Sequence, residues 1–265
     1  MPQLAANLTL LYNDLPFMER FAAAARSGFK AVEFLFPYDF AAEDIATQLR
    51  IHGLRLVLHN LPAGNWEQGE RGIACHPDRV EEFREGVQTA LQYARTLGTP
   101  RMNCLAGLLP PGVNAAVARA TLVSNLRHAA NALQAQGIQL TMEPINTFDM
   151  PGFFVSRTDQ ALALMAEVGS DNLFLQYDIY HAQRMEGELA QTMRRALPRI
   201  AHMQLADNPG RNEPGTGEIN YRFLFEWLDQ AGYQGHIGCE YRPANSAAGG
   251  TDEGLGWVAA HGLAL

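Results

Sequence analysis

The stretch Phe174–His181, FLQYDIYH, decides the fold. It starts as an apolar run and ends in Asp178 and His181, as a buried strand does when its last residues emerge into a polar pocket. Three further segments show this pattern: Gln139–Asn146 with Glu143, Ile200–Asn208 with Gln204 and Asp207, and His236–Arg242 with Glu240. Because the strand ends of a parallel α/β barrel face one mouth, we expect the polar side chains of these segments to converge there.

The rest of the chain alternates helix-like windows with short apolar strands. In Val80–Leu97, apolar residues recur every three or four positions, which gives one buried helix face. A glycine follows most such windows, as at Gly98, and supplies the left-handed residue that ends a helix. The expected strands are Leu4–Leu10, Ala31–Phe36, Leu54–Leu58, Arg101–Leu105, Ile138–Met142, Asn172–Tyr177, Ile200–Leu205 and His236–Glu240. The expected helices are Phe17–Arg26, Ala42–Ile51, Val80–Leu97, Asn114–Gln136, Thr158–Val168, Glu186–Leu197, Tyr221–Gln230 and Asp252–His261.

These eight strand–helix units follow one another without a change of composition or a linker. The 265 residues also match the roughly 250 residues of an α/β barrel. The sequence therefore predicts a single (β/α)8 TIM barrel domain over residues 1–265.

Composition narrows the classes of partner and compartment. A net charge of −8 argues against a nucleic-acid partner, which requires clustered Lys and Arg. Apolar runs are too short to span a bilayer, and the first residues lack the features of a signal peptide. Three cysteines without a CxxC motif fit reduced thiols. We expect a cytoplasmic protein that binds a small molecule, with no nucleic-acid or membrane partner; the oligomeric state stays open.

Two connections are longer than the usual two to six residues. They are Asn60–Arg79 and Asn208–Asn220, and both follow strands, so both are expected at the mouth of the barrel. Long loops with Gly and Pro at that position are candidate lids.

The four strand-end side chains Glu143, Asp178, Gln204 and Glu240 form an oxygen-rich set. Carboxylate and amide oxygens suit a divalent metal such as Mg²⁺ or Mn²⁺. The alternative for each acid is a helix cap or a surface residue. Because four strand-like segments end in this way, we favour a metal site.

Glu143 and Glu240 are also a candidate catalytic pair. Two carboxylates beside a small substrate can take a proton from one carbon and return it to the next. A pair of glutamates can alternatively hydrolyse a glycoside. The sequence shows no aromatic platform for a sugar, so proton transfer is the favoured interpretation.

Three residues are predicted to bind substrate: His59, Arg71 and His181. Together with Arg211 and Arg242 they suit a substrate with a carboxylate, because Arg grips that group with two parallel hydrogen bonds. The alternatives are structural histidines and surface ion pairs.

A family resemblance runs from about Ala5 to Pro243. It is carried by VEFLFPYDF (Val32–Phe40), HNLPAGNWEQGERGIAC (His59–Cys75), NCLAG (Asn103–Gly107), EPIN (Glu143–Asn146), QYDIYHAQRMEGEL (Gln176–Leu189), ADNPGRNEPGTGEINY (Ala206–Tyr221) and GCEYRP (Gly238–Pro243). With these stretches the chain resembles the xylose isomerase-like barrel superfamily and, within it, the hydroxypyruvate isomerase family.

The resemblance implies an activity, the interconversion of hydroxypyruvate and 2-hydroxy-3-oxopropanoate through an enediolate. It also implies catalytic roles for Glu143 and Glu240, and metal binding by these two with Asp178 and Gln204. Related sugar epimerases carry His at the position of Gln204.

Other functions stay open as alternatives. The 2-oxo-tetronate isomerases share GEINY and GCEY with this chain, but the NLPAG and ERGIAC features of the first long loop favour hydroxypyruvate. A sugar epimerase is a further alternative within the superfamily. An abasic-site endonuclease would need more metal-binding His residues and a basic face, and a non-catalytic binding protein would not need two opposed glutamates.

Overall fold

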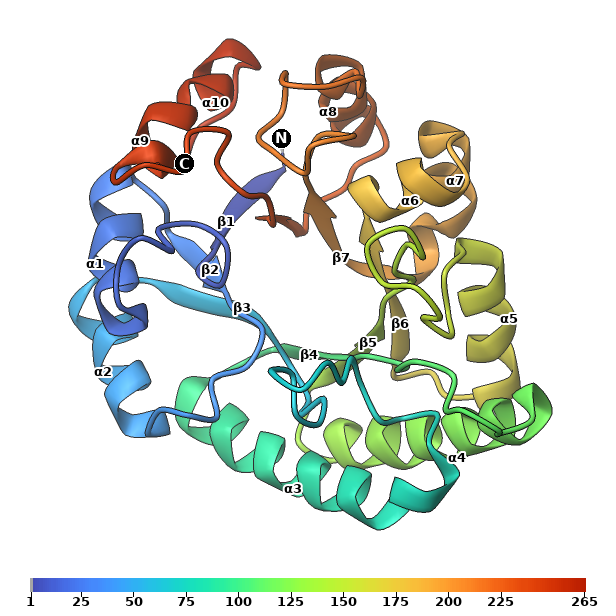
Figure 1. Ribbon diagram of the computed structural model, residues 1–265. Coiled ribbons are helices and arrows are strands. Elements are labelled where there is room, and N and C mark those ends of the chain that lie inside the picture. The colour runs from blue at the N-terminus through green and yellow to red at the C-terminus, as the bar shows by residue number, and fades with distance from the viewer. Residues whose placement is uncertain (1) are drawn as a thin grey trace.

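Eight parallel strands close into one barrel, as predicted. The computed structural model of the protein describes residues 2–265. Strands pair in sequence order, and β1 also pairs with β8, which closes the barrel (Figure 1). The strands are β1 (Gln3–Asn7), β2 (Ala31–Glu33), β3 (Arg55–Asn60), β4 (Arg101–Cys104), β5 (Gln139–Met142), β6 (Leu173–Asp178), β7 (Ile200–Leu205) and β8 (His236–Cys239).

The helices form a ring outside the strands (Figure 1). They are α1 (Phe17–Ser27), α2 (Ala42–Ile51), α3 (Val80–Leu97), α4 (Ala115–Gln134), α5 (Thr158–Val168), α6 (Ile179–Met185), α7 (Leu189–Ala196), α8 (Tyr221–Gln230), α9 (Gly250–Gly254) and α10 (Gly256–Ala260), with short 3-10 turns η1 (Pro77–Arg79) and η2 (Leu197–Arg199). Within residues 2–265, none of these helices is both long and apolar enough to cross a bilayer.

The apolar stripe of α3 explains how the ring attaches to the barrel. Phe83, Val87 and Leu91 are buried in the main core, which lies between strands and helices. Gly98 ends this helix with a φ of 67°, the left-handed conformation that the sequence predicted for it. The periodic pattern therefore gave the right helix and the right end.

Several elements differ from the sequence prediction, and β2, for example, ends at Glu33 rather than Phe36. The first strand ends at Asn7 rather than Leu10, because the Asn7 carbonyl accepts from the backbone N–H groups of Leu10 and Leu11 and turns the chain. The predicted helix Glu186–Leu197 begins only at Leu189, as α7, because Gly187 adopts a φ of 63°; α6, before it, is a helix that was not predicted from the sequence. The predicted helix Asp252–His261 is two short helices, α9 and α10.

Candidate active site

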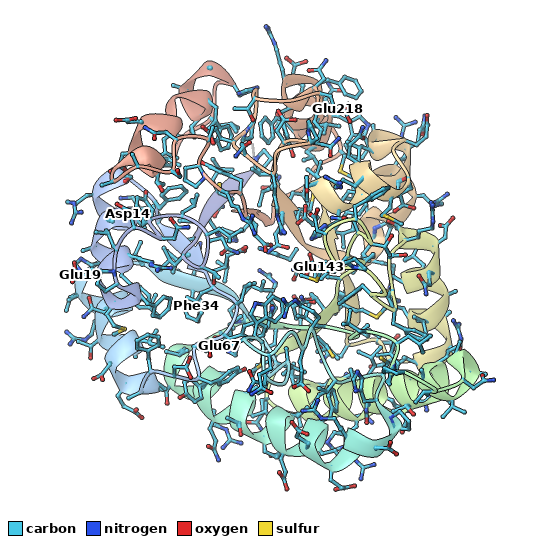
Figure 2. All side chains as sticks on the ribbon, in the orientation of Figure 1. Asp14, Glu19, Phe34, Glu67, Glu143 and Glu218 are labelled. Carbon is cyan, nitrogen blue, oxygen red and sulfur yellow. The ribbon has the colours of Figure 1, made fainter. Side chains whose placement is uncertain are left out.

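A cavity of about 510 Å³ lies at the mouth of the barrel. Both long loops contribute to its wall, the first with Trp66 and Arg71 and the second with Arg211. Both predicted catalytic glutamates line it, together with His181. Figure 2 shows Glu143 inside the ring of strands, whereas the exposed Glu19 and Glu218 lie at the periphery.

Glu143 follows β5 directly and is 4% exposed. Its Oε2 accepts from Asn103 Nδ2 on β4 and from Gln176 Nε2 on β6, both at 3.0 Å. Its Oε1 lies 3.7 Å from His181 Nε2. Burial, followed by the negative charges of Glu240 and Asp178, raises the pKa of Glu143 well above its ordinary value. This environment therefore favours the protonated form of Glu143.

Asp178 is the last residue of β6 and begins the next helix. Its Oδ1 accepts from the backbone N–H of Tyr180 at 2.8 Å and so caps α6. Its Oδ2 is buried and has no hydrogen-bond partner among residues 2–265. Burial raises the pKa of Asp178 to about 6, although the nearby Arg211 opposes the shift. One oxygen thus organises the backbone, and the other is left for a ligand.

His181 lies on α6, one turn after Asp178, and not in a strand. Asn146 fixes its tautomer. The Asn146 side-chain oxygen accepts from the backbone N–H groups of Phe148 and Asp149, so its Nδ2 faces His181 Nδ1 and donates to it at 2.7 Å. Nδ1 is then the acceptor and Nε2 carries the hydrogen.

The Nε2–H of His181 points toward the acids, at 3.7 Å from Glu143 Oε1 and 3.6 Å from Asp178 Oδ2. Burial, with the positive charges of Arg211 and Arg184, holds the pKa of His181 well below its ordinary value. His181 is therefore a neutral hydrogen-bond donor directed into the site.

Glu240 follows β8 and pairs with Arg211, whose side chain is 14% exposed. Arg211 Nη2 donates to Glu240 Oε1 at 3.1 Å and lies 3.9 Å from Asp178 Oδ2. Burial raises the pKa of Glu240 to about 8, although Arg211 opposes the shift. Glu240 Oε2 is buried, and residues 2–265 offer it no hydrogen-bond partner. The carboxyl groups of Glu143, Asp178 and Glu240 thus lie buried around the guanidinium of Arg211.

Comparison with known proteins shows the family of the chain. The Xylose isomerase-like TIM barrel family matches residues 21–261. The chain belongs to this family. It is 52% identical over 258 residues to a hydroxypyruvate isomerase from Escherichia coli (strain K12), an alignment that covers 97% of this chain and 98% of that protein. It is 48% identical over 258 residues to a 2-oxo-tetronate isomerase from Cupriavidus necator, covering 97% and 98% of the two chains.

A solved structure places the whole chain in this family's fold. The crystal structure of an AP endonuclease, family 2, from Brucella melitensis superposes with a TM-score of 0.94 at 42% identity. The match covers 98% of this chain and 99% of that chain. With the two isomerases, these matches confirm the predicted fold and the predicted enzyme class, an isomerase of this xylose isomerase-like family.

Among residues 2–265, one group of side chains at the mouth of the barrel could hold a metal ion. Single ligand atoms of Glu143, Asp178 and His181 all lie within 4.8 Å of one another. Glu143 and Asp178 belong to the predicted metal set, whereas His181 was predicted to bind substrate. The structure thus brings together residues that the sequence had assigned to two neighbouring sites.

Gln204, the fourth residue of the predicted metal set, is fully buried on β7, where it pairs in register with Asp178. Both ends of its amide are occupied. Its Oε1 accepts from Gln176 Nε2 at 2.7 Å, and its Nε2 donates to Glu33 Oε1 at 2.8 Å. Metal binding by Gln204 stays a prediction, and it would have to use the second lone pair of its oxygen.

The substrate-binding role predicted for His59 stays a prediction, and His59 is not among the residues that line the cavity. Its ring is fully buried beside Phe34 and Tyr38, and its Nδ1 meets the backbone oxygen of Asn60. Burial lowers the pKa of His59 to about 4. Successive strand residues point to opposite faces, so the next residue, Asn60, lines the cavity in its place.

Arg71 lines the cavity but is held by its own loop. Its Nη1 donates to the backbone oxygens of Trp66 and Glu70, and its guanidinium lies 4.3 Å from the centre of the Trp66 ring. The Glu70 carboxylate pairs with Arg79 instead. The deeper arginine is Arg211, which the sequence singled out only as one of several candidate cations.

Proposed function

We propose that the chain interconverts hydroxypyruvate and 2-hydroxy-3-oxopropanoate. The observation that carries the proposal is the pair Glu143 and Glu240, buried in one cavity with raised pKa values. Raised pKa values suit carboxyl groups that both accept and donate protons near neutral pH. The hydroxypyruvate isomerase from Escherichia coli, similar along nearly the whole chain, supports the choice of substrate.

The reaction moves one proton between adjacent carbons. One glutamate removes a proton from C3 of hydroxypyruvate, which leaves an enediolate over C2 and C3. The other glutamate delivers a proton to C2, while the hydroxyl proton on O3 moves to O2. The first glutamate then carries an extra proton and the second lacks one, and proton exchange with water restores both. Atoms and electrons balance, so no external oxidant or reductant takes part.

His181 and Arg211 would stabilise the charge that develops on the substrate oxygens. His181 presents a neutral Nε2–H, which can donate to an enediolate oxygen without protonating it. Arg211 keeps its charge, because the surrounding carboxylates raise its pKa more than burial lowers it. We place the substrate carboxylate toward Arg71, whose side chain lines the cavity from the opposite long loop.

A divalent metal, Mg²⁺ or Mn²⁺, fits the residues of this site. Two buried carboxylate oxygens, on Asp178 and Glu240, lack hydrogen-bond partners within residues 2–265, and an ion would satisfy them. Glu143, Asp178, Gln204 and Glu240 would hold it; His181 suits the role less well because its Nε2 carries the hydrogen. A bound ion would polarise the substrate oxygens and make the C3 proton more acidic.

Metal removal is therefore expected to lower activity. Dialysis against a chelator should reduce kcat, and Mg²⁺ or Mn²⁺ should restore it, because without the ion Asp178 Oδ2 and Glu240 Oε2 have no partner within residues 2–265. Turnover and metal content by elemental analysis are measured on the same sample. Full activity in a demonstrably metal-free preparation would contradict the metal proposal and leave His181 and Arg211 as the stabilising groups.

Proton NMR of the purified protein with hydroxypyruvate in D₂O tests the function. We expect signals of 2-hydroxy-3-oxopropanoate and incorporation of deuterium from solvent. A protein that leaves hydroxypyruvate unchanged, with or without added Mg²⁺ and Mn²⁺, would contradict the proposal.

A four-carbon substrate is the second candidate. The cavity of about 510 Å³ is larger than a three-carbon acid needs, and the relative from Cupriavidus necator is a 2-oxo-tetronate isomerase. The ratio of kcat/KM for 2-oxo-tetronate and hydroxypyruvate, measured with one preparation, separates the two. We expect hydroxypyruvate to be preferred, and the reverse ratio would assign the longer acid.

A further inference from the structure

A second buried acid, Glu33, lies in the barrel apart from the proposed chemistry. It is the last residue of β2 and is fully buried, and it is not among the residues that line the cavity. Asn7 Nδ2 at 2.9 Å and Gln204 Nε2 at 2.8 Å donate to its Oε1, and His202 Nε2 lies 2.6 Å from its Oε2. The Asn7 side-chain oxygen accepts from the backbone N–H of Thr9, so its NH2 group faces Glu33 and Oε1 of Glu33 is the acceptor.

Strand β8, which pairs with β1 on the side away from β2, leaves room for this carboxyl group. Gly238 on β8 lies directly against it, and a Cβ atom there would stand 2.2 Å from Glu33 Oε1 and 2.3 Å from Oε2. A side chain at position 238 would therefore displace the carboxyl group. Glu33 thus provides a hydrogen-bond acceptor inside the barrel, and Gly238 leaves the space that it occupies.

Glu33 determines which way the amide of Gln204 points. Because Oε1 of Glu33 is an acceptor, the Gln204 NH2 group must face it and the Gln204 oxygen must face away. That oxygen accepts from Gln176 Nε2 at 2.7 Å. Gln176 is thereby oriented in turn, with its NH2 group on the side of Gln204 and Glu143.

The chain of amides ends on a predicted catalytic glutamate. The same Gln176 Nε2 donates to Glu143 Oε2 at 3.0 Å, and the Thr141 hydroxyl lies 3.2 Å from Gln176 Oε1, which fixes the other end of the amide. The hydrogen bond from Gln176 thus fixes the position of Glu143 Oε2. Glu143 Oε1 is left on the side of His181, where the proposed chemistry takes place.

We propose that Glu33 is a positioning residue, which acts through Gln204 and Gln176 to hold Glu143 with one oxygen toward the substrate. The kinetic part of this proposal rests on the proposed function. Partners of this kind, one step removed from the reacting groups, typically change activity by about 10- to 100-fold when they are lost.

Two substitutions at position 33 separate positioning from bulk. In Glu33→Gln the new side-chain oxygen can replace Oε1 and still accept from Asn7 and Gln204. Its NH2 group then faces His202, whose Nδ1 has no partner in the described residues and can take the ring hydrogen. Glu33→Met has a similar length but offers Gln204 no acceptor. We expect Glu33→Gln to rescue what Glu33→Met loses.

The kinetic experiment measures kcat and KM for hydroxypyruvate at saturating Mg²⁺. Glu33→Met should lower kcat by about 10- to 100-fold with KM changed less than about threefold, because Glu143 is misplaced and the carboxylate-binding wall is not. Asn172→Leu is the matched control. Asn172 directly precedes β6, and its Nδ2 donates to the backbone oxygens of Ala130 and Ile138. The substitution removes both hydrogen bonds and lowers stability without changing the amide chain. Equal kcat losses in the two variants would overturn the proposal.

A measurement without substrate tests the amide chain itself. Gln176 and Gln204 are the buried glutamines of residues 2–265, so their side-chain NH2 groups should exchange slowly with D₂O in ¹⁵N-glutamine-labelled protein. Both should stay slow in Glu33→Gln and Asn172→Leu and become fast in Glu33→Met. Slow exchange of both in Glu33→Met would overturn the proposal. An inactive wild type would contradict only the proposed function, because this measurement still decides whether Glu33 orients the chain.

Discussion

The two long loops at the mouth hold their arginines in opposite ways. They follow β3 and β7, which are four strands apart in the eight-stranded barrel and hence on opposite sides. Arg71 stacks on Trp66 and bonds backbone oxygens of its own loop, whereas Arg211 reaches the buried carboxylates of Glu240 and Asp178. Arg211 is therefore part of the site before substrate arrives, and Arg71 has to exchange partners to reach a substrate.

The contacts that hold each loop in place also differ. Asp207 accepts from four backbone N–H groups of the second loop, at 2.8 to 3.0 Å: those of Asn208, Gly215, Gly217 and Ile219. In the first loop, Glu70 pairs with Arg79, and both side chains are partly exposed. Exposed ion pairs contribute only about 0–1 kcal/mol. The second loop is thus a fixed wall and the first is the better candidate for a moving lid.

The largest effect is expected from Arg211→Met. The substitution leaves Glu240 and Asp178 without their cation and removes a fixed donor near the reacting oxygens. We expect kcat/KM to fall by about 10² to 10³. Steady-state kinetics with Arg211→Lys as control measures this, since lysine keeps the charge but not the fork of donors. Near-normal kinetics in folded Arg211→Met would mean that the second loop is only a wall.

A smaller, substrate-dependent effect is expected from Arg71→Met. If Arg71 pairs with the substrate carboxylate, KM for hydroxypyruvate should rise by about ten- to a hundredfold, in line with a charged hydrogen bond. KM for an uncharged analogue that the enzyme accepts, such as dihydroxyacetone, should barely change. Equal losses on both substrates would show that Arg71 shapes its loop without gripping the carboxylate.

The smallest effect is expected from Asp207→Asn. The amide keeps one oxygen acceptor and loses the other, so part of the second loop is released while Arg211 remains. We expect kcat/KM to fall by about tenfold, an effect of misplacing a binding group without removing it. Limited proteolysis should show faster cleavage within Asn208–Asn220 than in the wild type. Unchanged kinetics together with unchanged cleavage would remove the distinction between the two loops.

The sequence predicted the fold and the mouth acids because both depend on local patterns. Apolar runs, helix periodicity and glycines gave the strands and most helices, and the acids after β5, β6 and β8 stood out against those runs. The missed features depend on contacts between distant segments. Asp178 caps a short helix, which moved His181 off the strand, and alternation along β3 turned His59 away from the cavity.

Glu33 and Arg211 show what further signal was present. An acid at the end of the short apolar segment Ala31–Glu33 was itself a sign of a buried polar partner, but its donors come from β1 and β7. Arg211 is one of several loop arginines, and its approach to Glu240 depends on a backbone φ of 55° that no sequence pattern marked. Contacts of this kind form only in the closed barrel, so a local sequence pattern cannot predict them.

The central claim is that Glu143 and Glu240 each carry a proton, and deuterium exchange in single-glutamine variants tests it most directly. Proton NMR in D₂O follows C3 of hydroxypyruvate and product formation together for Glu143→Gln and Glu240→Gln. The kcat of both variants should fall by at least about 10²-fold. One should still exchange the C3 hydrogen without forming product, and the other should do neither. Near-wild-type turnover in either folded variant would contradict the two-glutamate account.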